Sequence, residues 1–264
     1  MSHEPREESK TELQSQLTNQ KISALKKYQM MTIGRSGLWR LIKYELIMLI
    51  CNRCSGALGY FLRKILYPRL LGHVGKGTVF GRDMTLRHPH KIRVGDHCVF
   101  DDLVVLDAKG ETNQGITIGD NVIIARNTVI SCKNGNITIG DNSNISLNCM
   151  IHSEKNVVIG PKNLWAAYCY IIGGGKHNFD RIDMPIIQQG SQVDGIQMSE
   201  DIWLGARVTI FDGCSIGKGV VIGAGSLVNK DIPDYKIAAG VPVKIIKDRA
   251  GQKGNESPSE SSQT

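Results

Sequence analysis

Residues 198–228 read MSEDIWLGARVTIFDGCSIGKGVVIGAGSLV, and this stretch decides the fold. An aliphatic residue recurs at every sixth position, in a series that comprises Met198, Leu204, Ile210, Ile216, Ile222 and Val228. A period of six is neither the 3.6-residue period of an α-helix nor the simple alternation of a β-strand. A fixed short repeat of this kind is typical of a parallel β-helix. The sequence therefore predicts a prism built from stacked coils.

The same rhythm fills the chain upstream, in triplets that begin at Val74, Val94, Ile118, Ile139 and Ile159. Three hexads form one coil, whose aliphatic residues point inward and stack on those of the next coil about 4.8 Å away. The slot four residues later must hold a small residue at a corner, and Cys98, Cys149, Cys169 and Cys214 are explained by it. We expect a mainly β protein with about seven coils over residues 73–248, preceded by a helical segment.

One insertion between coils is much longer than the others. It spans roughly residues 173–197, begins with Gly173-Gly174-Gly175 and contains His177 and Pro185. Long loops in compact domains are usually functional or disordered. A neutral imidazole at the base of such a loop suits a general base that takes a proton from a hydroxyl or an amine. We therefore predict that His177 is the catalytic residue.

The positive charge of the chain is concentrated before the repeat. Residues 1–92 carry 16 Lys and Arg against 6 Asp and Glu, whereas the chain as a whole has a net charge of +7. Residues 36–72 combine these cations with apolar and aromatic residues in a basic amphipathic helical pattern. Such a segment either caps the open end of the prism or lies in a membrane interface. Its uncharged runs are too short to span a bilayer. No nucleic-acid-binding motif accompanies the positive charge.

The repeat and several ordered motifs resemble the hexapeptide-repeat acyltransferases, within the branch of galactoside, maltose, xenobiotic and polysaccharide O-acetyltransferases. The matching motifs are the His177 loop that ends in Pro185-Ile186, then Ile202-Trp203-Leu204-Gly205-Ala206, Val221-Ile222-Gly223-Ala224-Gly225-Ser226, Asn229-Lys230-Asp231-Ile232-Pro233 and Ala238-Ala239-Gly240-Val241-Pro242-Val243-Lys244. This resemblance covers about two-thirds of the chain, from Val74 to Asp248. It implies a left-handed β-helix.

The resemblance also implies a function. The chain would be a homotrimeric, acetyl-CoA-dependent O-acetyltransferase that acts on a hydroxyl of a sugar or polysaccharide, in surface polysaccharide or glycolipid biosynthesis. His177 would deprotonate the acceptor, which attacks the thioester directly. The positions that match the family's cofactor-binding residues are Trp203, Gly205, Gly223, Ala224, Asn229, Lys230, Lys244 and Lys247. Where the family often has Arg, this chain has Lys at positions 244 and 247.

The alternative is a non-catalytic solenoid that serves as a scaffold or a membrane-associated assembly module. We expect no metal, because His152 lacks the further histidines that a zinc site on this fold needs. Residues 1–35 are interpreted as a polar, flexible region, and residues 249–264 as a disordered tail, since both are poor in apolar residues. With no export signal recognised, we expect a cytoplasmic protein, peripheral at the inner face of the membrane if residues 36–72 bind lipid.

Overall fold

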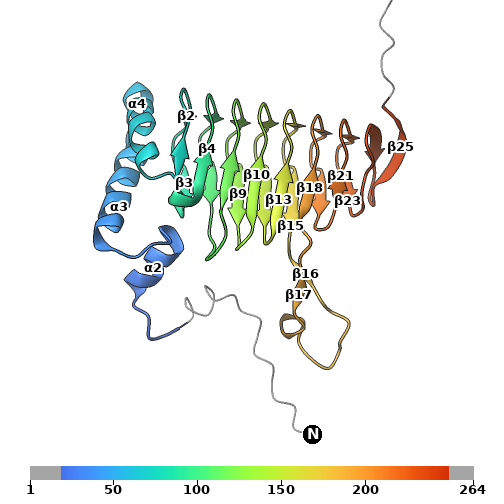
Figure 1. Ribbon diagram of the computed structural model, residues 1–264, viewed down its shortest axis with the longest axis horizontal. Helices are drawn as coiled ribbons and strands as arrows, with labels where there is room; N and C mark the ends of the chain where they lie inside the picture. The colour runs from blue at the N-terminus through green and yellow to red at the C-terminus, as the bar shows by residue number, and fades with distance from the viewer. Residues whose placement is uncertain (1–18, 250–264) are drawn as a thin grey trace, which may run out of the picture.

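The computed structural model describes residues 19–249 and consists of a three-sided β-solenoid with helices at its N-terminal end (Figure 1). The three faces are parallel sheets with one strand of each coil per face, except for a final antiparallel pair. Successive strands follow the order face A, face B, face C. The predicted parallel β-helix is therefore confirmed.

Face A has seven strands: β1 (His73–Val74), β4 (Ile92–Val94), β7 (Ile116–Ile118), β10 (Asn136–Ile139), β13 (Asn156–Ile159), β18 (Ile196–Met198) and β21 (Ser215–Ile216). Face B has nine: β2 (Val79–Phe80), β5 (Val99–Phe100), β8 (Ile123–Ile124), β11 (Asn144–Ile145), β14 (Leu164–Trp165), β19 (Trp203–Leu204), β22 (Val221–Ile222), β24 (Lys236–Ala239) and β25 (Lys244–Asp248). Face C has seven: β3 (Thr85–Arg87), β6 (Val105–Asp107), β9 (Val129–Cys132), β12 (Met150–Ser153), β15 (Tyr170–Gly173), β20 (Thr209–Phe211) and β23 (Leu227–Val228).

The hexad positions form the core of the solenoid. Ile118, Ile124 and Ile130 are buried, and each pairs in register with the hexad residue of the next coil. The four corner cysteines are buried as well, and the Sγ atom of Cys98 lies 3.0 Å from the carbonyl oxygen of Gly119. Burial raises the pKa of the Cys98 thiol, so this side chain stays a neutral packing element.

Aspartates hold the corner between faces A and B together. The Oδ1 atom of Asp96 accepts a hydrogen bond from the backbone N–H of Lys76, one coil below, at 2.7 Å. The N–H of Asp96 donates to Asp120, and that of Asp120 donates to Asp141. Each carboxylate thus satisfies a backbone donor that the sheets leave free at the corner. This ladder explains the Gly-Asp pairs of the repeat.

Among the described residues, three α-helices precede the solenoid: α2 (Ala24–Thr32), α3 (Leu38–Arg53) and α4 (Gly56–Leu66), followed by the 3-10 turn η1 (Tyr67–Arg69). Helices α3 and α4 cover the first coil, where Ile47, Cys51 and Tyr67 join the solenoid core (Figure 1). The helix α2 lies inside the segment predicted to be polar and flexible, and residues 1–18 and 250–264 lie outside the described residues. None of the helices in the described part of the chain is long and apolar enough to cross a membrane.

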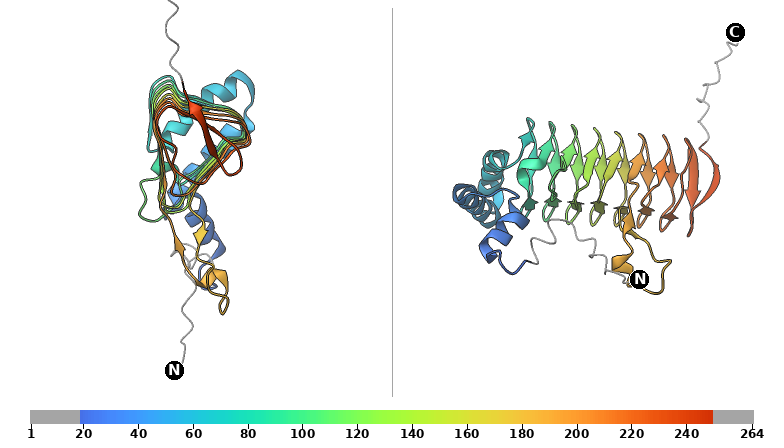
Figure 2. Two further views of the ribbon diagram at one scale, coloured as in Figure 1. Left: turned by 90° about the vertical axis from the view of Figure 1, so that its right-hand side faces the viewer. Right: turned by 60° about the horizontal axis from the view of Figure 1, so that its bottom comes forward.

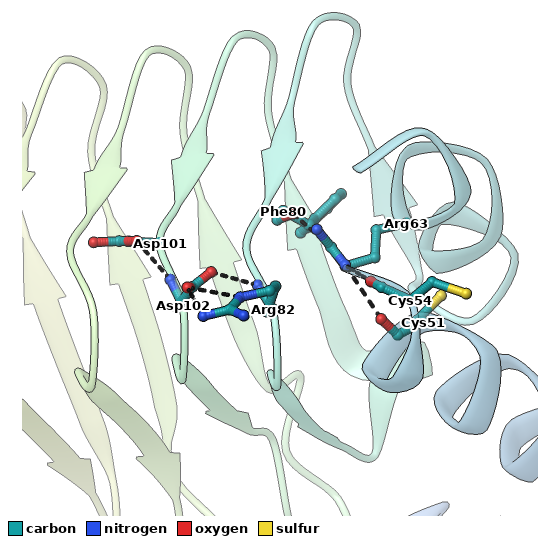
Figure 3. Close-up of polar contacts among 7 residues, drawn as sticks. All are labelled: Cys51, Cys54, Arg63, Phe80, Arg82, Asp101 and Asp102. Carbon is teal, nitrogen blue, oxygen red and sulfur yellow. Dashed lines mark hydrogen bonds and ion pairs between the residues drawn. The ribbon is translucent and has the colours of Figure 1, made fainter. Parts of the chain in front are cut away.

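A buried arginine fixes the helices to the first coil (Figure 3). The guanidinium of Arg63, on α4, donates through Nε to the carbonyl oxygen of Phe80 at 2.9 Å. Its Nη1 atom donates to the carbonyl oxygens of Cys51 and Cys54, at 3.2 and 3.0 Å. One side chain therefore ties α3, the α3–α4 corner and β2 together. The ring of Phe80 continues this contact by stacking on Phe100 of the next coil, with centroids 5.4 Å apart.

Candidate active site

The long insertion forms an arm that leaves the corner between faces C and A. Its strands β16 (Lys176–His177) and β17 (Ser191–Gln192) pair antiparallel, and the 3-10 turn η3 (Ile186–Gln188) lies near its tip. His177 pairs with Ser191 in register, and its side chain is exposed. Figure 2 shows the arm projecting away from the prism in the end-on view. The imidazole is thus accessible to a substrate at the side of the solenoid.

Hydrogen bonds within the arm give it a defined shape. The Oε1 atom of Gln189 accepts a hydrogen bond from the backbone N–H of Arg181 at 3.0 Å. The Nε2 atom of Gln189 in turn donates a hydrogen bond to the carbonyl oxygen of Arg181. The amide of Asn178, next to His177, donates to the carbonyl oxygen of Gln189 at 3.1 Å. The two sides of the arm are therefore cross-linked on the side of His177 that faces the tip.

A charged cluster lies at the base of the arm. The carboxylate of Glu154 accepts a hydrogen bond from Lys133 at 2.8 Å and lies 3.6 Å from the Nε2 atom of His152. The second carboxylate oxygen of Glu154 accepts a hydrogen bond from the backbone N–H of Gly175, two residues before His177, at 3.4 Å. Burial alone would raise the pKa of Glu154, but the hydrogen bond and charge of Lys133, with the Gly175 and His152 contacts, hold it below its usual value. Glu154 is therefore an ionised anchor for the arm.

Sequence reasoning did not single out Lys133 and Glu154. They come from successive coils and stand where those coils carry small insertions at the same corner. The recurrence of polar insertions at one corner, one coil apart, is the signal that identifies them. Among the residues that the structure describes, no group of three His, Cys, Asp or Glu side chains is arranged to hold a metal ion.

The predicted cofactor residues lie in three regions. Trp203 lies on the outer surface of face B, between Leu164 and Val221 in register, and its side chain is 53% exposed. Lys244 and Lys247 are exposed on β25, at the C-terminal end of the same face. Asn229 and Lys230 are exposed after β23, at the corner between faces C and A.

Gly205 and Gly223 follow Trp203 and Ile222 at the corner between faces B and C, where coil stacking explains both glycines. A Cβ atom on Gly205 would lie 2.5 Å from the backbone nitrogen of Ala224 in the next coil, and one on Gly223 would lie 2.8 Å from the Cβ of Ala239. Ala224 itself is exposed beside them. The glycines therefore allow close stacking of the coils, and the open surface at this corner begins at Ala224.

His177 and Trp203 lie on opposite sides of one chain. The arm leaves the corner between faces C and A, whereas Trp203 lies on face B, the side of the triangle opposite that corner (Figure 2). A site that uses both residues requires a second copy of the chain, whose face B meets the arm of the first. Face B is suited to such a contact, since its outer surface carries two pairs of exposed apolar side chains, Val99 with Ile123 and Leu164 with Trp203, which Asn144 separates.

Comparison with known proteins agrees with the fold and the repeat. A family model described as "Hexapeptide repeat of succinyl-transferase" matches residues 108–132 and 200–230. The chain is 37% identical over 100 residues to the probable acetyltransferase Rv3034c of Mycobacterium tuberculosis. This alignment covers 38% of this chain and 33% of that protein. It is 35% identical over 103 residues to the putative lipopolysaccharide biosynthesis O-acetyl transferase WbbJ of Escherichia coli. This second alignment covers 37% of this chain and 53% of that protein.

Among solved structures, the polySia-specific acetyltransferase NeuO aligns with a TM-score of 0.53 and 25% identity, over 69% of this chain and 84% of NeuO. The class that the solenoid, its six-residue repeat and its single long arm define is the hexapeptide-repeat proteins. Within that class, the aligned segments of the chain are similar to those of acetyltransferases. The chain spans between a third and about half of the length of the curated relatives reported above.

Proposed function

We propose that this protein is an acetyl-CoA-dependent O-acetyltransferase that modifies a sugar hydroxyl in surface polysaccharide or glycolipid biosynthesis. Similarity to Rv3034c and WbbJ supports acetyl transfer, and the description of WbbJ as a putative lipopolysaccharide biosynthesis O-acetyl transferase supports a saccharide acceptor. The observation that carries the proposal is the arm, which presents His177 at the one large interruption of an otherwise regular solenoid.

The proposed chemistry is a direct transfer. The imidazole of His177 takes the proton of the acceptor hydroxyl while the oxygen attacks the thioester carbonyl of acetyl-CoA. The tetrahedral intermediate collapses with loss of the CoA thiolate, which takes the proton back from the imidazolium. The products are the acetyl ester and CoA–SH, so atoms and protons balance without an acyl-enzyme. Backbone N–H groups are the donors expected to stabilise the oxyanion.

The proposed active unit is a homotrimer, as the resemblance implies, since a contact between the arm of one chain and face B of the next is head-to-tail and such contacts close into rings. In such a ring the arm of one chain lies against face B of its neighbour, which brings His177 to Trp203. The exposed apolar side chains on face B support this packing, and so do the exposed Phe179 and Ile182 near the tip of the arm. Three equivalent sites result, one at each junction.

Acetyl-CoA is proposed to lie along face B and its corner with face C. Trp203 would contact the acyl or pantetheine part, which passes over Ala224, where the surface is open. Lys244 and Lys247 would face the phosphates, as cations commonly do. Asn229 and Lys230 lie at the other corner, so in the trimer they would reach the cofactor of a neighbouring junction.

The test measures CoA release with a thiol-reactive dye and a panel of sugar acceptors. Wild-type protein should release CoA in an acceptor-dependent manner, and His177→Ala should lower kcat by about 10²- to 10⁴-fold, the usual contribution of a general base. His73→Ala is the matched control, because His73 is also exposed but lies on β1, far along the chain from the arm. Unchanged turnover in His177→Ala would refute the general base, and no transfer from acetyl-CoA to any acceptor would favour the scaffold.

A further inference from the structure

Helices α3 and α4 carry a second apolar surface that the solenoid does not cover. On α3, Leu41 and Tyr44 are buried, whereas Trp39, Leu46 and Leu49 are exposed on the opposite side of the helix. On α4, Leu58 and Phe61 are exposed in the same way. Trp39 is the extreme case, with 82% of its surface accessible. A large contiguous apolar surface on a water-soluble domain usually marks an interaction site.

A cavity lined by cations lies on the flank of the same helix. It has a volume of about 160 Å³, and its wall includes Arg35, Arg40, Lys43 and Arg69, the set that we call the cation cavity. Among the described residues, no aspartate or glutamate contributes to this wall. At about 30 Å³ per water molecule, the space holds roughly five waters, enough for one phosphate group.

Backbone carbonyls hold three of these cations in place without neutralising them. Arg40 donates to the carbonyl oxygen of Ser36 at 3.0 Å, and Lys43 donates to that of Arg69 at 2.7 Å. Arg69 in turn donates to the carbonyl oxygen of Ile65 at 2.8 Å. Within residues 19–249, none of the four cations forms an ion pair with a carboxylate. Confined like charges repel, so the arrangement favours an anion between them.

A second, larger cavity adjoins the first and extends the positive region. It has a volume of about 320 Å³, shares Arg35 and His90 with the cation cavity and adds Lys26 and Lys91. Of the described residues in its wall, one is an acid, Glu111. Burial, followed by the charge of Arg35, lowers the pKa of His90 to about 4, so the imidazole is neutral at physiological pH. The electropositive character of the region therefore comes from lysine and arginine alone.

We propose that the cation cavity binds the phosphate group of an anionic membrane lipid while the outward faces of α3 and α4 lie in the bilayer interface. Arginine forks match phosphate oxygens in a bidentate manner. A lipid is favoured over a soluble phosphate compound because Arg40 and Lys43 project from the same helix as the exposed Trp39 and Leu46. Apolar side chains with aromatic and basic neighbours are the composition of interfacial helices. The proposal does not depend on acetyl transfer.

Vesicle flotation with the full-length protein tests this proposal. Wild type is expected to bind vesicles of phosphatidylcholine and phosphatidylglycerol in equal parts, and to bind pure phosphatidylcholine vesicles much more weakly. Arg40→Gln with Lys43→Gln should weaken binding about 30-fold, which corresponds to about 1 kcal/mol per charge. Arg93→Gln with Lys155→Gln removes the same charge from exposed positions on the solenoid and should leave binding within about twofold.

Trp39→Ser with Leu46→Ser should abolish vesicle binding while leaving the circular dichroism spectrum and the thermal transition unchanged. Equal binding to both kinds of vesicle, or an equal loss in the solenoid control, would overturn the phosphate site. Inorganic phosphate and pyrophosphate distinguish a soluble ligand from a lipid. If calorimetry shows that they bind and the protein does not float with vesicles, the ligand is soluble and the lipid assignment is wrong. If wild type forms a larger assembly that the Trp39→Ser, Leu46→Ser variant dissolves, a second copy covers this face, which also refutes the proposal.

Discussion

Two inactive variants of this protein should restore activity when they assemble together. His177→Ala removes the proposed base from the arm, and Trp203→Ala removes the aromatic side chain from face B. In one chain these residues lie on opposite sides of the triangle. If each site combines the arm of one chain with face B of the next, a chain lacking His177 still supplies an intact face B, and a chain lacking Trp203 still supplies an intact arm.

The size of the effect follows from the geometry of a ring. A closed trimer that contains both variants has one junction where an intact arm meets an intact face B, whichever variant is in excess. Random assembly from equal amounts makes about three quarters of the rings mixed, so about a quarter of all sites are intact. Because His177→Ala alone should retain about 1% or less of wild-type kcat, the mixture should rise to about 25% of wild type.

The assay is acceptor-dependent CoA release after co-expression, or after joint unfolding and refolding, of the two variants. The control pairs His177→Ala with the double variant His177→Ala, Trp203→Ala, a mixture in which no chain supplies the base, and it should stay at the level of His177→Ala. Activity of the first mixture no higher than the mean of its two parents would show that His177 and Trp203 do not meet between chains.

Three further variants probe the cap, the arm and the response to pH. Arg63→Leu leaves three carbonyl oxygens, two of them in buried hydrogen bonds, without their donor and should lower the free energy of unfolding by about 3 kcal/mol in urea titrations; Lys64→Leu, next to it, should change little. Glu154→Gln removes the ionised anchor of the arm and should lower kcat/KM by about 10- to 100-fold with little change in thermal stability, since its ion pair with Lys133 is partly exposed. Because the pKa of His90 falls from its usual 6.5 to about 4 on folding, the unfolded chain binds the proton more readily, so stability should decline as the pH falls from 6.5 to 4. His90→Gln should flatten that part of the stability curve, and a wild-type curve that is level over this range would contradict the assignment.

The solenoid is predictable from sequence because each hexad residue has one environment. Ile124 faces the core whatever its distant neighbours are, so a period in the sequence becomes a column in the structure. The Gly-Asp corners are local in the same sense. The arm is predictable as a departure from the period, and with it His177. These features can be predicted without knowing which coil contacts the helices or the arm.

Contacts that depend on the register between coils or on helix docking are not predictable in this way. Glu154 meets Lys133 and Gly175 because three successive coils carry insertions at one corner, and the hexad pattern leaves the shapes of those insertions open. Arg63 looks like one more surface cation of a basic helix, yet it is buried against backbone carbonyls of α3 and β2. Gly205 matches a cofactor motif, but the contact that a Cβ there would make is with the next coil. In each case the neighbour comes from tertiary packing.

The corner between faces C and A collects the appendages of the molecule because it is where the stack tolerates them. Insertions within a face would break the register of every coil, whereas a corner can lengthen without moving the strands. The helix α2, which precedes the solenoid and contributes Lys26 to the larger cavity, projects to the same side of the prism as the arm that carries His177 (Figures 1 and 2). Pro89 and His90, which follow β3, line the cation cavity, and the arm follows β15, four strands further along face C, which amounts to roughly 19 Å. A lipid phosphate in the cation cavity and a hydroxyl at His177 are therefore too far apart to belong to one monosaccharide. They can belong to one acceptor only if a chain of several sugar units joins them along this corner, so an acceptor panel should include lipid-linked oligosaccharides of increasing length.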